Sequence, residues 1–199
     1  MNDTSIASSD NAPEIVARPD RTIVLVGMMG VGKSTVGKRL AHRLGVSFID
    51  ADNEIEKAAG LTIPEIFEKY GEPHFRDGER RVIARLLRDQ PAHVLAAGGG
   101  AFNDPETRQR IADRAISVWL SADLEVLAGR VAKRNNRPML EGGDSVLERL
   151  RTLSAERDPI YCLADMQIDT SEGNPDDSVN RVIAALEQKG LMKVYENRQ

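Results

Sequence analysis

The sequence is constrained most by a glycine-rich segment near its N-terminus, residues 27–35, which reads GMMGVGKST. The five residues before it, TIVLV at 22–26, form a short, β-branched apolar run that is typical of a buried parallel strand. After the segment, Val36, Leu40 and Leu44 recur every four residues, which predicts a helix. A strand, the pattern G-x-x-x-x-G-K-S and a helix, in this order, predict a phosphate-binding P-loop.

Each residue type in this segment has a physical reason to be there. Glycines at 27, 30 and 32 allow a tight turn and a close approach to an anion. Consecutive N–H groups at a helix N-terminus then form a concave nest that favours negative charge. Lys33 can reach the β- and γ-phosphates, and the Ser34 hydroxyl can coordinate Mg²⁺. The alternative, a glycine-rich turn that matches the motif by chance, is disfavoured by the flanking strand and helix. The segment predicts a site for a nucleoside triphosphate.

The composition argues against several classes of partner. With 27 basic and 31 acidic residues, the net charge is −4, whereas proteins that bind the nucleic-acid backbone normally have a basic surplus. No apolar run approaches the roughly 20 residues that a membrane span requires. A single cysteine, Cys162, allows neither an intramolecular disulfide nor a cysteine-rich metal site. We therefore expect a cytoplasmic, monomeric enzyme with no nucleic-acid or membrane partner.

The order of predicted elements indicates an α/β fold with a five-stranded parallel sheet that has helices on both faces. Strands are predicted at 22–26, 46–49, 93–97, 116–120 and 166–169. Helices are predicted at 33–44, 53–59, 64–70, 74–89, 105–113, 123–133, 145–163 and 176–189. We expect one domain over residues 21–190. Residues 1–20, polar and without the features of a secretion signal, are expected to form a disordered leader, and residues 191–199 a tail.

Two segments depart from plain alternation of strands and helices. More than forty residues separate the second and third predicted strands, so we expect a helical insertion at about 51–90. The segment at about 133–144 is polar and basic and ends in a glycine pair, which is typical of a mobile lid. A solvated loop is the alternative. Arg134 and Arg137, opposite a polyphosphate site, favour the lid.

The second predicted strand ends in two carboxylates, Asp50 and Asp52. Residues two apart on a strand share a face, and ligands of open α/β sheets bind at the carboxyl ends of strands. We expect Asp52 to accept a proton from the attacking hydroxyl, and Asp50 to support the hydrated metal ion through water. The alternative for Asp52 is a helix N-cap, which would leave Asp50 without a role.

Two further segments carry candidate groups for an anionic acceptor. In the insertion, Arg76 and Glu79 are helix neighbours, and a glutamate can fix the arginine fork for bidentate capture of a carboxylate. The alternative is an exposed ion pair worth less than about 1 kcal/mol. Glycines 98–100 end the third predicted strand, where a ligand can bond to the main chain. A flexible hinge is the competing interpretation.

The predicted helix 145–163 places Arg157 on its inward stripe, where an unpaired charge would be costly. A buried salt bridge is one explanation, and an anionic substrate is the other. Pro159 is expected to kink this helix just after Arg157.

These motifs, in this order, resemble the shikimate kinase family over about residues 21–190. The P-loop is followed by F-x-D-x-D at 48–52, F-R-x-x-E at 75–79, the triple glycine at 98–100, R-P-M-L at 137–140 and R-x-P-x-Y at 157–161. The resemblance implies a P-loop kinase core with a substrate-binding insertion and a lid. It also implies MgATP-dependent phosphorylation of the 3-hydroxyl of shikimate, on the route to chorismate and the aromatic amino acids.

The resemblance also implies residue roles. Contacts with shikimate fall on Asp52, Arg76, Gly98, Gly99, Gly100 and Arg157. Contacts with ATP fall on Gly30, Val31, Gly32, Lys33, Ser34, Thr35 and Arg137, with Arg130 against the adenine. Asp52, Lys33 and Arg137 are the expected catalytic residues, and Ser34 and Asp50 the expected metal contacts. Two departures from the family pattern are Met139, where leucine is usual, and the absence of a basic residue in 173–175.

Two other functions fit parts of the pattern. A kinase for another small hydroxy acid, such as gluconate, would also pair a P-loop with an acidic strand end, but it would not explain the triple glycine or the F-R-x-x-E segment. A regulatory nucleotide-binding module would explain only the P-loop. It would not require a candidate base, a lid or arginines for a substrate.

Overall fold

A five-stranded parallel sheet forms the centre of the molecule in the computed structural model, which describes residues 15–134 and 145–196. Its strand order is β3-β4-β2-β5-β6, and every neighbouring pair is parallel. The strands are β2 Thr22–Val26, β3 Phe48–Asp50, β4 Val94–Ala96, β5 Ala115–Ser121 and β6 Met166–Asp169. The predicted five-stranded parallel sheet is therefore confirmed.

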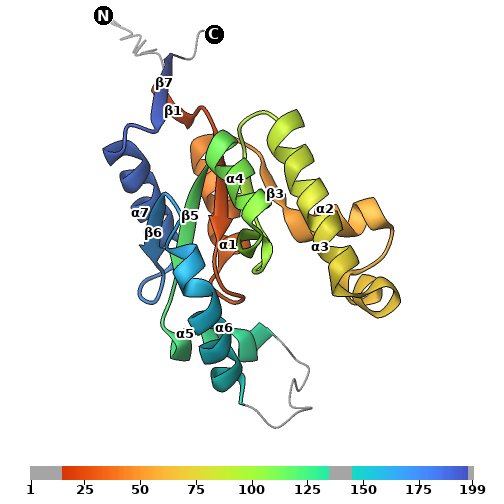
Figure 1. Ribbon diagram of the computed structural model, residues 1–199. Helices are drawn as coiled ribbons and strands as arrows, with labels where there is room; N and C mark the ends of the chain where they lie inside the picture. The colour runs from red at the N-terminus through yellow and green to blue at the C-terminus, as the bar shows by residue number, and fades with distance from the viewer. Residues whose placement is uncertain (1–14, 135–144, 197–199) are drawn as a thin grey trace, which may run out of the picture.

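Helices lie on both sides of this sheet (Figure 1). Helix α1 packs against α7, and α4 packs against α3 and β5. The helices are α1 Lys33–Leu44, α2 Ala51–Ala59, α3 Ile63–Asp89, α4 Pro105–Arg114, α5 Leu124–Arg134, α6 Val146–Tyr161 and α7 Pro175–Gln188, with a short 3₁₀ turn at Ala101–Asn103. Pro159 lies inside α6, which continues past it to Tyr161.

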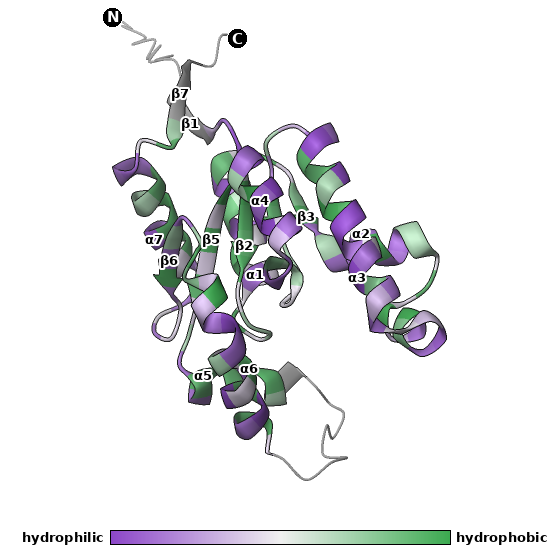
Figure 2. Ribbon diagram, in the orientation of Figure 1, coloured by the Kyte–Doolittle hydropathy of each residue, from purple (hydrophilic) through white to green (hydrophobic). Residues whose placement is uncertain are grey.

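Burial explains why the sequences of the central strands are short runs of apolar residues. All five residues of β2 are buried, because the strand has neighbours on both edges and helices over both faces. Apolar residues dominate β2, whereas the surrounding helices combine polar and apolar residues (Figure 2). In the described part of the chain, no helix is both long enough and apolar enough to cross a membrane.

The insertion consists of α2 and α3, which stand to one side of the sheet (Figure 1). Helix α2 begins at Ala51, two residues earlier than predicted, because the Asp50 side chain caps it. The two helices predicted at 64–70 and 74–89 form the single element α3, which contains a break at Gly71 (φ 79°, ψ 171°). The positive φ explains why glycine stands at this break.

The chain ends depart from the sequence prediction. Residues 1–20 were expected to be disordered and 191–199 to form a tail, but β1 (Ile15–Pro19) pairs with β7 (Met192–Glu196). These strands form a separate two-stranded antiparallel sheet that extends away from the central sheet (Figure 1). The two strands are far apart in sequence, so local composition could not indicate their pairing.

Gly37 provides a test of the packing between α1 and the sheet. A Cβ added at Gly37 would lie 2.6 Å from the Phe48 ring and 3.1 Å from Leu25 Cδ1, whereas one added at Gly129 in α5 would meet nothing within 4 Å. Gly37→Ala should therefore lower the free energy of unfolding by about 1–3 kcal/mol through overpacking. The matched change Gly129→Ala should raise it by about 0.5–1 kcal/mol. Urea denaturation of both variants checks the difference, and an equal effect at the two sites would contradict this packing.

Candidate active site

The P-loop connects β2 to α1 and owes its shape to its glycines. Gly27, Gly30 and Gly32 all have positive φ, at 133°, 79° and 102°. A Cβ at Gly27 would also lie 2.3 Å from the Leu120 carbonyl oxygen, so a side chain there would disrupt the contact with β5. Because Gly32 is the N-cap of α1, the free N–H groups of this helix start at the loop.

Lys33, the first residue of α1, folds back over the loop. Its ammonium donates hydrogen bonds to the carbonyl oxygens of Gly27, at 2.7 Å, and Met28, at 3.1 Å. The positive charge therefore lies against the same backbone whose N–H groups form the predicted anion site.

Asp50 and Ser34 connect the P-loop helix with β3. Ser34 Oγ donates to Asp50 Oδ2 at 2.8 Å, and Asp50 Oδ1 accepts from the Asp52 backbone N–H at 3.2 Å. Asp50 is therefore the N-cap of α2, and the alternative that assigned this cap to Asp52 is wrong. The two oxygen-bearing side chains predicted to serve a metal ion lie within hydrogen-bonding distance of each other.

Asp52 lies in the first turn of α2, half-buried beside the loop that contains glycines 98–100. Burial raises the pKa of its carboxyl group, and the nearby Asp50 carboxylate raises it further, while Lys33 and Arg76 act in the opposite direction. A raised pKa brings a carboxylate closer to the range in which it works as a general base.

Charged side chains occupy the space in which a side chain at Gly98 or Gly100 would have to lie. A Cβ at Gly98 would lie 2.5 Å from Glu79 Oε1, and one at Gly100 would lie 2.7 Å from an Arg76 guanidinium nitrogen. None of the three glycines 98–100 has a positive φ, so glycine at 98 and 100 serves close approach, whereas a Cβ at Gly99 would be no closer than 3.5 Å to its neighbours. This packing favours a ligand-contacting loop over a flexible hinge.

Arg76 is held by two glutamates of its own helix. One guanidinium nitrogen contacts Glu79 at 2.7 Å, and the other side of the fork contacts Glu72 at 3.0 and 3.2 Å. Phe75 lies under the guanidinium, 5.0 Å from its central carbon. Glu79 is 3% exposed, which rules out the surface-pair alternative. Burial raises the pKa of Glu79, and Arg76 opposes this shift.

Arg157 reaches the same loop from α6. Arg157 donates to the Gly99 carbonyl oxygen at 3.2 Å. The hydroxyl of the fully buried Tyr161 donates to the same oxygen. The Nε of Arg157 is buried and has no hydrogen-bond partner among the described residues. The part of the chain that the structure describes also contains no ion pair of Arg157, which disfavours the buried-salt-bridge alternative. An inward arginine in this state is suited to an anionic ligand.

A cavity of about 350 Å³ lies beside the P-loop. Arg130 lines it and is oriented by two hydrogen bonds, one to the Thr170 carbonyl oxygen at 2.6 Å and one to the Thr170 hydroxyl at 3.3 Å. The other lining residues include several that were predicted to contact ATP and several that were not: Gly30, Val31, Gly32 and Thr35 in the first group, and Thr170, Asn174 and Pro175 in the second. The sequence signal near the second group was limited to 173–175, which departs from the family pattern, and no signal marked Thr170.

The structure brings most of the predicted site residues to one edge of the sheet. Asp52, Arg76 and Arg157 lie around the loop 98–100. Lys33 is close enough to Asp52 to affect its pKa, and Ser34 donates a hydrogen bond to Asp50, which accepts another from the Asp52 backbone N–H. Sequence reasoning used Glu79 to fix Arg76 but did not foresee its close approach to Gly98. Arg137, Met139 and the predicted lid from 135 onward lie outside the described residues.

Comparison with known proteins identifies the family. The shikimate kinase family model matches residues 29–187. The chain is 54% identical over 183 residues to a shikimate kinase of Caulobacter vibrioides, covering 92% of this chain and 88% of that protein. The chain belongs to the shikimate kinase family. It is also 49% identical to the shikimate kinase of Novosphingobium aromaticivorans, covering 94% of this chain and 98% of the relative.

Solved structures agree with this membership. A shikimate kinase from Acinetobacter baumannii in complex with shikimate has a TM-score of 0.78 and 40% identity, covering 86% of this chain and 95% of that one. A gluconokinase from Sinorhizobium meliloti has a TM-score of 0.54 and 20% identity over 86% of this chain and 94% of that chain. The second likeness shows a shared fold alone.

The raised pKa of Asp52 predicts how stability depends on pH. A carboxyl group whose pKa is higher in the folded than in the unfolded protein destabilises the fold at pH values above both pKa values. Asp52→Asn should therefore raise the free energy of unfolding at about pH 7, and this gain should shrink as the pH falls through the folded pKa. Urea denaturation at about pH 7 and pH 4 measures both values. A gain that does not change with pH would contradict the shift.

Proposed function

We propose that this kinase transfers the γ-phosphoryl group of MgATP to the 3-hydroxyl of shikimate, yielding shikimate 3-phosphate and ADP. The observation that carries the proposal is the convergence of Asp52, Arg76 and Arg157 on the loop 98–100, beside a P-loop. One carboxylate and two arginines match an acceptor that carries a hydroxyl group and a carboxylate. The reaction lies on the route to chorismate and the aromatic amino acids.

In this proposal, the acceptor carboxylate is held by arginines from two different elements. Arg76 comes from α3 with its fork fixed by Glu79, and Arg157 comes from α6 with a buried Nε available. Planar guanidinium groups suit bidentate capture of a carboxylate. Backbone groups of Gly98, Gly99 and Gly100 would contact the ring, because a glycine has no side chain of its own to keep a ligand away from the main chain.

The nucleotide is held by the P-loop, residues 30–35, with its adenine toward Arg130. Mg²⁺ prefers oxygen ligands and is usually bound through substrate phosphates with few protein groups. Ser34 Oγ and the Asp50 carboxylate, 2.8 Å apart, fit that donor set, with Asp50 acting through water. Among the described residues, there is no cluster of three or more His, Cys, Asp or Glu side chains that could hold a metal ion alone. When bound, Mg²⁺ neutralises charge on the phosphates.

Asp52 accepts the proton of the 3-hydroxyl group. The oxygen of that hydroxyl bonds to the γ-phosphorus, and the bond between the γ-phosphorus and the bridging oxygen breaks, so that ADP leaves. Lys33 stabilises the charge that builds on the phosphoryl oxygens, since phosphoryl transfer depends mainly on positioning and electrostatics. The family resemblance assigns Arg137, in the lid of about 133–144, to the same task. We propose a cytoplasmic monomer, which gel filtration would check.

A coupled ADP-release assay tests the function with shikimate, quinate and gluconate as parallel acceptors. Turnover should occur with shikimate. Turnover with another acid alone would retain the P-loop mechanism but overturn the acceptor. ATP binding without turnover on any acid would favour a regulatory nucleotide-binding module.

Asp52→Asn should lower kcat by roughly 10²-fold or more, because general-base assistance is worth about that much. ATP binding, measured by calorimetry, should be unchanged because Asp52 does not belong to the P-loop. Near-normal turnover would remove Asp52 from the role of base.

Arg76→Lys should act mainly on the KM for shikimate, because an ammonium group cannot reproduce a planar, bidentate fork. Steady-state kinetics with saturating MgATP would give the change, and circular dichroism would report folding. An unchanged KM in a variant that unfolds more readily would make Arg76 a structural residue.

A further inference from the structure

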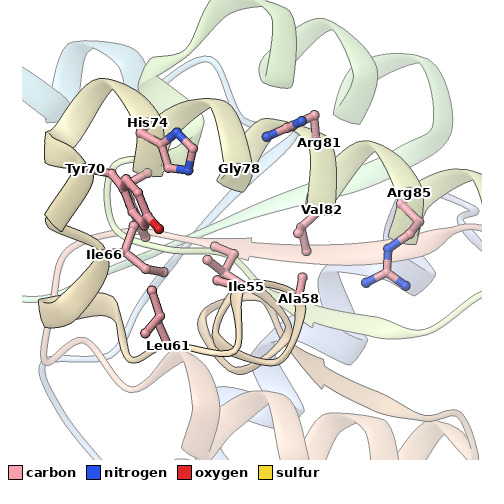
Figure 3. Close-up of a pocket in the computed structure, with 12 residues that line it drawn as sticks. Ile55, Ala58, Leu61, Ile66, Tyr70, His74, Gly78, Arg81, Val82 and Arg85 are labelled. Atoms are coloured by element: carbon pink, nitrogen blue, oxygen red, sulfur yellow. The ribbon is translucent and has the colours of Figure 1, made fainter.

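A cavity of about 580 Å³ lies between α2 and α3, away from the glycine loop (Figure 3). Its size falls within the roughly 300–1,000 Å³ that small-molecule sites occupy. Apolar side chains from both helices and from the turn between them line it: Ile55, Ala58, Leu61, Ile66, Phe75 and Val82. This lining favours a ligand with an apolar body.

At one end, two arginines line the cavity, and none of the described residues that line it is acidic. Arg81 and Arg85 extend from α3 at this end (Figure 3), and both line the cavity. The Glu54 carboxylate that contacts Arg85 at 3.3 Å also contacts Lys57 at 2.7 Å. Arg81 contacts Asp77 at 3.0 Å, and Arg81 is 70% exposed. Asp77 also contacts Arg80, so both carboxylates are shared between two cations, and exposed pairs of this kind are weak enough for an anionic ligand to compete with them.

The other end of the cavity carries aromatic rings. Tyr70 and His74 lie with ring centroids 4.8 Å apart, and both line the cavity (Figure 3). Tyr70 is 48% exposed, and with Lys69 over its ring at 5.1 Å from the centroid, the exposed part of the ring offers apolar surface to a ligand. At a rise of 1.5 Å per residue, Arg81 lies about 10 Å along α3 from His74. That separation suits two aromatic rings with an acidic group attached.

We propose that this cavity binds a small aromatic monoanion, with its rings between α2 and α3 and its carboxylate or sulfonate at Arg81 and Arg85. The wall between the cavity and the acceptor site contains Ile55 and Phe75, which are 3% and 5% exposed. Ile55 lies one turn after Asp52, and Phe75 stacks on Arg76. A ligand that presses on Ile55 and Phe75 would shift the helix turns that carry Asp52 and Arg76, and the KM for shikimate should then rise. This last effect rests on the proposed function; the binding itself does not.

Fluorescence titration tests the binding with two probes that share an aromatic body. These are 8-anilinonaphthalene-1-sulfonate, which is an anion, and N-phenyl-1-naphthylamine, which is neutral. Saturating MgADP and shikimate are included so that the nucleotide and acceptor sites are filled. The anion should bind saturably and about fivefold more tightly than the neutral probe, the scale of an exposed ion pair. The double variant Arg81→Gln, Arg85→Gln should abolish this preference; a preference that survives would overturn the anion site.

Gly78→Leu localises the probe. A Cβ at Gly78 meets nothing within 4 Å, and Gly78 lines the cavity, so the leucine can enter it without disturbing α3. Probe binding should weaken by about tenfold or more, because the leucine fills the space. Gly129→Leu is the matched control, since Gly129 also lies in a helix with open space around it. Equal binding by both variants would place the probe elsewhere and overturn the proposal.

Kinetics with 2-naphthoate test the link to the acceptor. The wild-type KM for shikimate should rise about fivefold at saturation and then level off, the lower end of common coupling factors. Gly78→Leu should abolish this rise. An unlimited, competitive rise would mean that the acid occupies the acceptor site, and no rise would overturn the link. Because the fluorescence titrations need no turnover, failure of the cavity and failure of the proposed activity give different results.

Discussion

The acceptor site depends on a loop whose three glycines leave space for charged side chains from other elements. At Gly98 the Glu79 carboxylate occupies the space that a side chain would need, and at Gly100 the Arg76 guanidinium does so. Strand β4 brings this loop to the edge of the sheet where its neighbour β2 brings the P-loop. In parallel sheets this edge collects ligands, and in our proposal the phosphoryl donor and the hydroxyl acceptor meet there.

This arrangement leaves buried polar atoms unsatisfied, at a cost that a bound ligand would reduce. Glu79 Oε1 and Arg157 Nε are buried polar atoms without a hydrogen-bond partner among the described residues. Unsatisfied buried groups typically cost about 1–3 kcal/mol each, and more when charged. The buried central sheet offsets such costs, with the residues of β2 from Ile23 to Val26 fully inaccessible to solvent. The site therefore lowers the stability of the fold and in return contains polar groups that can bind a ligand.

Local patterns predicted most of the fold, whereas contacts between distant segments were missed. The run TIVLV and the four-residue periodicity after it located β2 and α1, because burial imposes these patterns on neighbouring residues. The alternative that made Asp52 the helix cap was wrong because Asp50 is the cap, and two acidic residues near a helix start look equally suitable. The pairing of Ile15–Pro19 with Met192–Glu196 and the approach of Glu79 to Gly98 join segments that no local pattern connects.

The most direct test of the acceptor site is a calorimetric comparison of shikimate with its methyl ester, which lacks the carboxylate charge. Charge-assisted hydrogen bonds are worth about 1.5–3 kcal/mol, so wild-type protein should bind the acid at least roughly tenfold more tightly than the ester. Arg157→Ala should remove most of that preference while retaining ester binding. An equal affinity of the wild-type protein for the acid and the ester would contradict the arginine clamp on which this account depends.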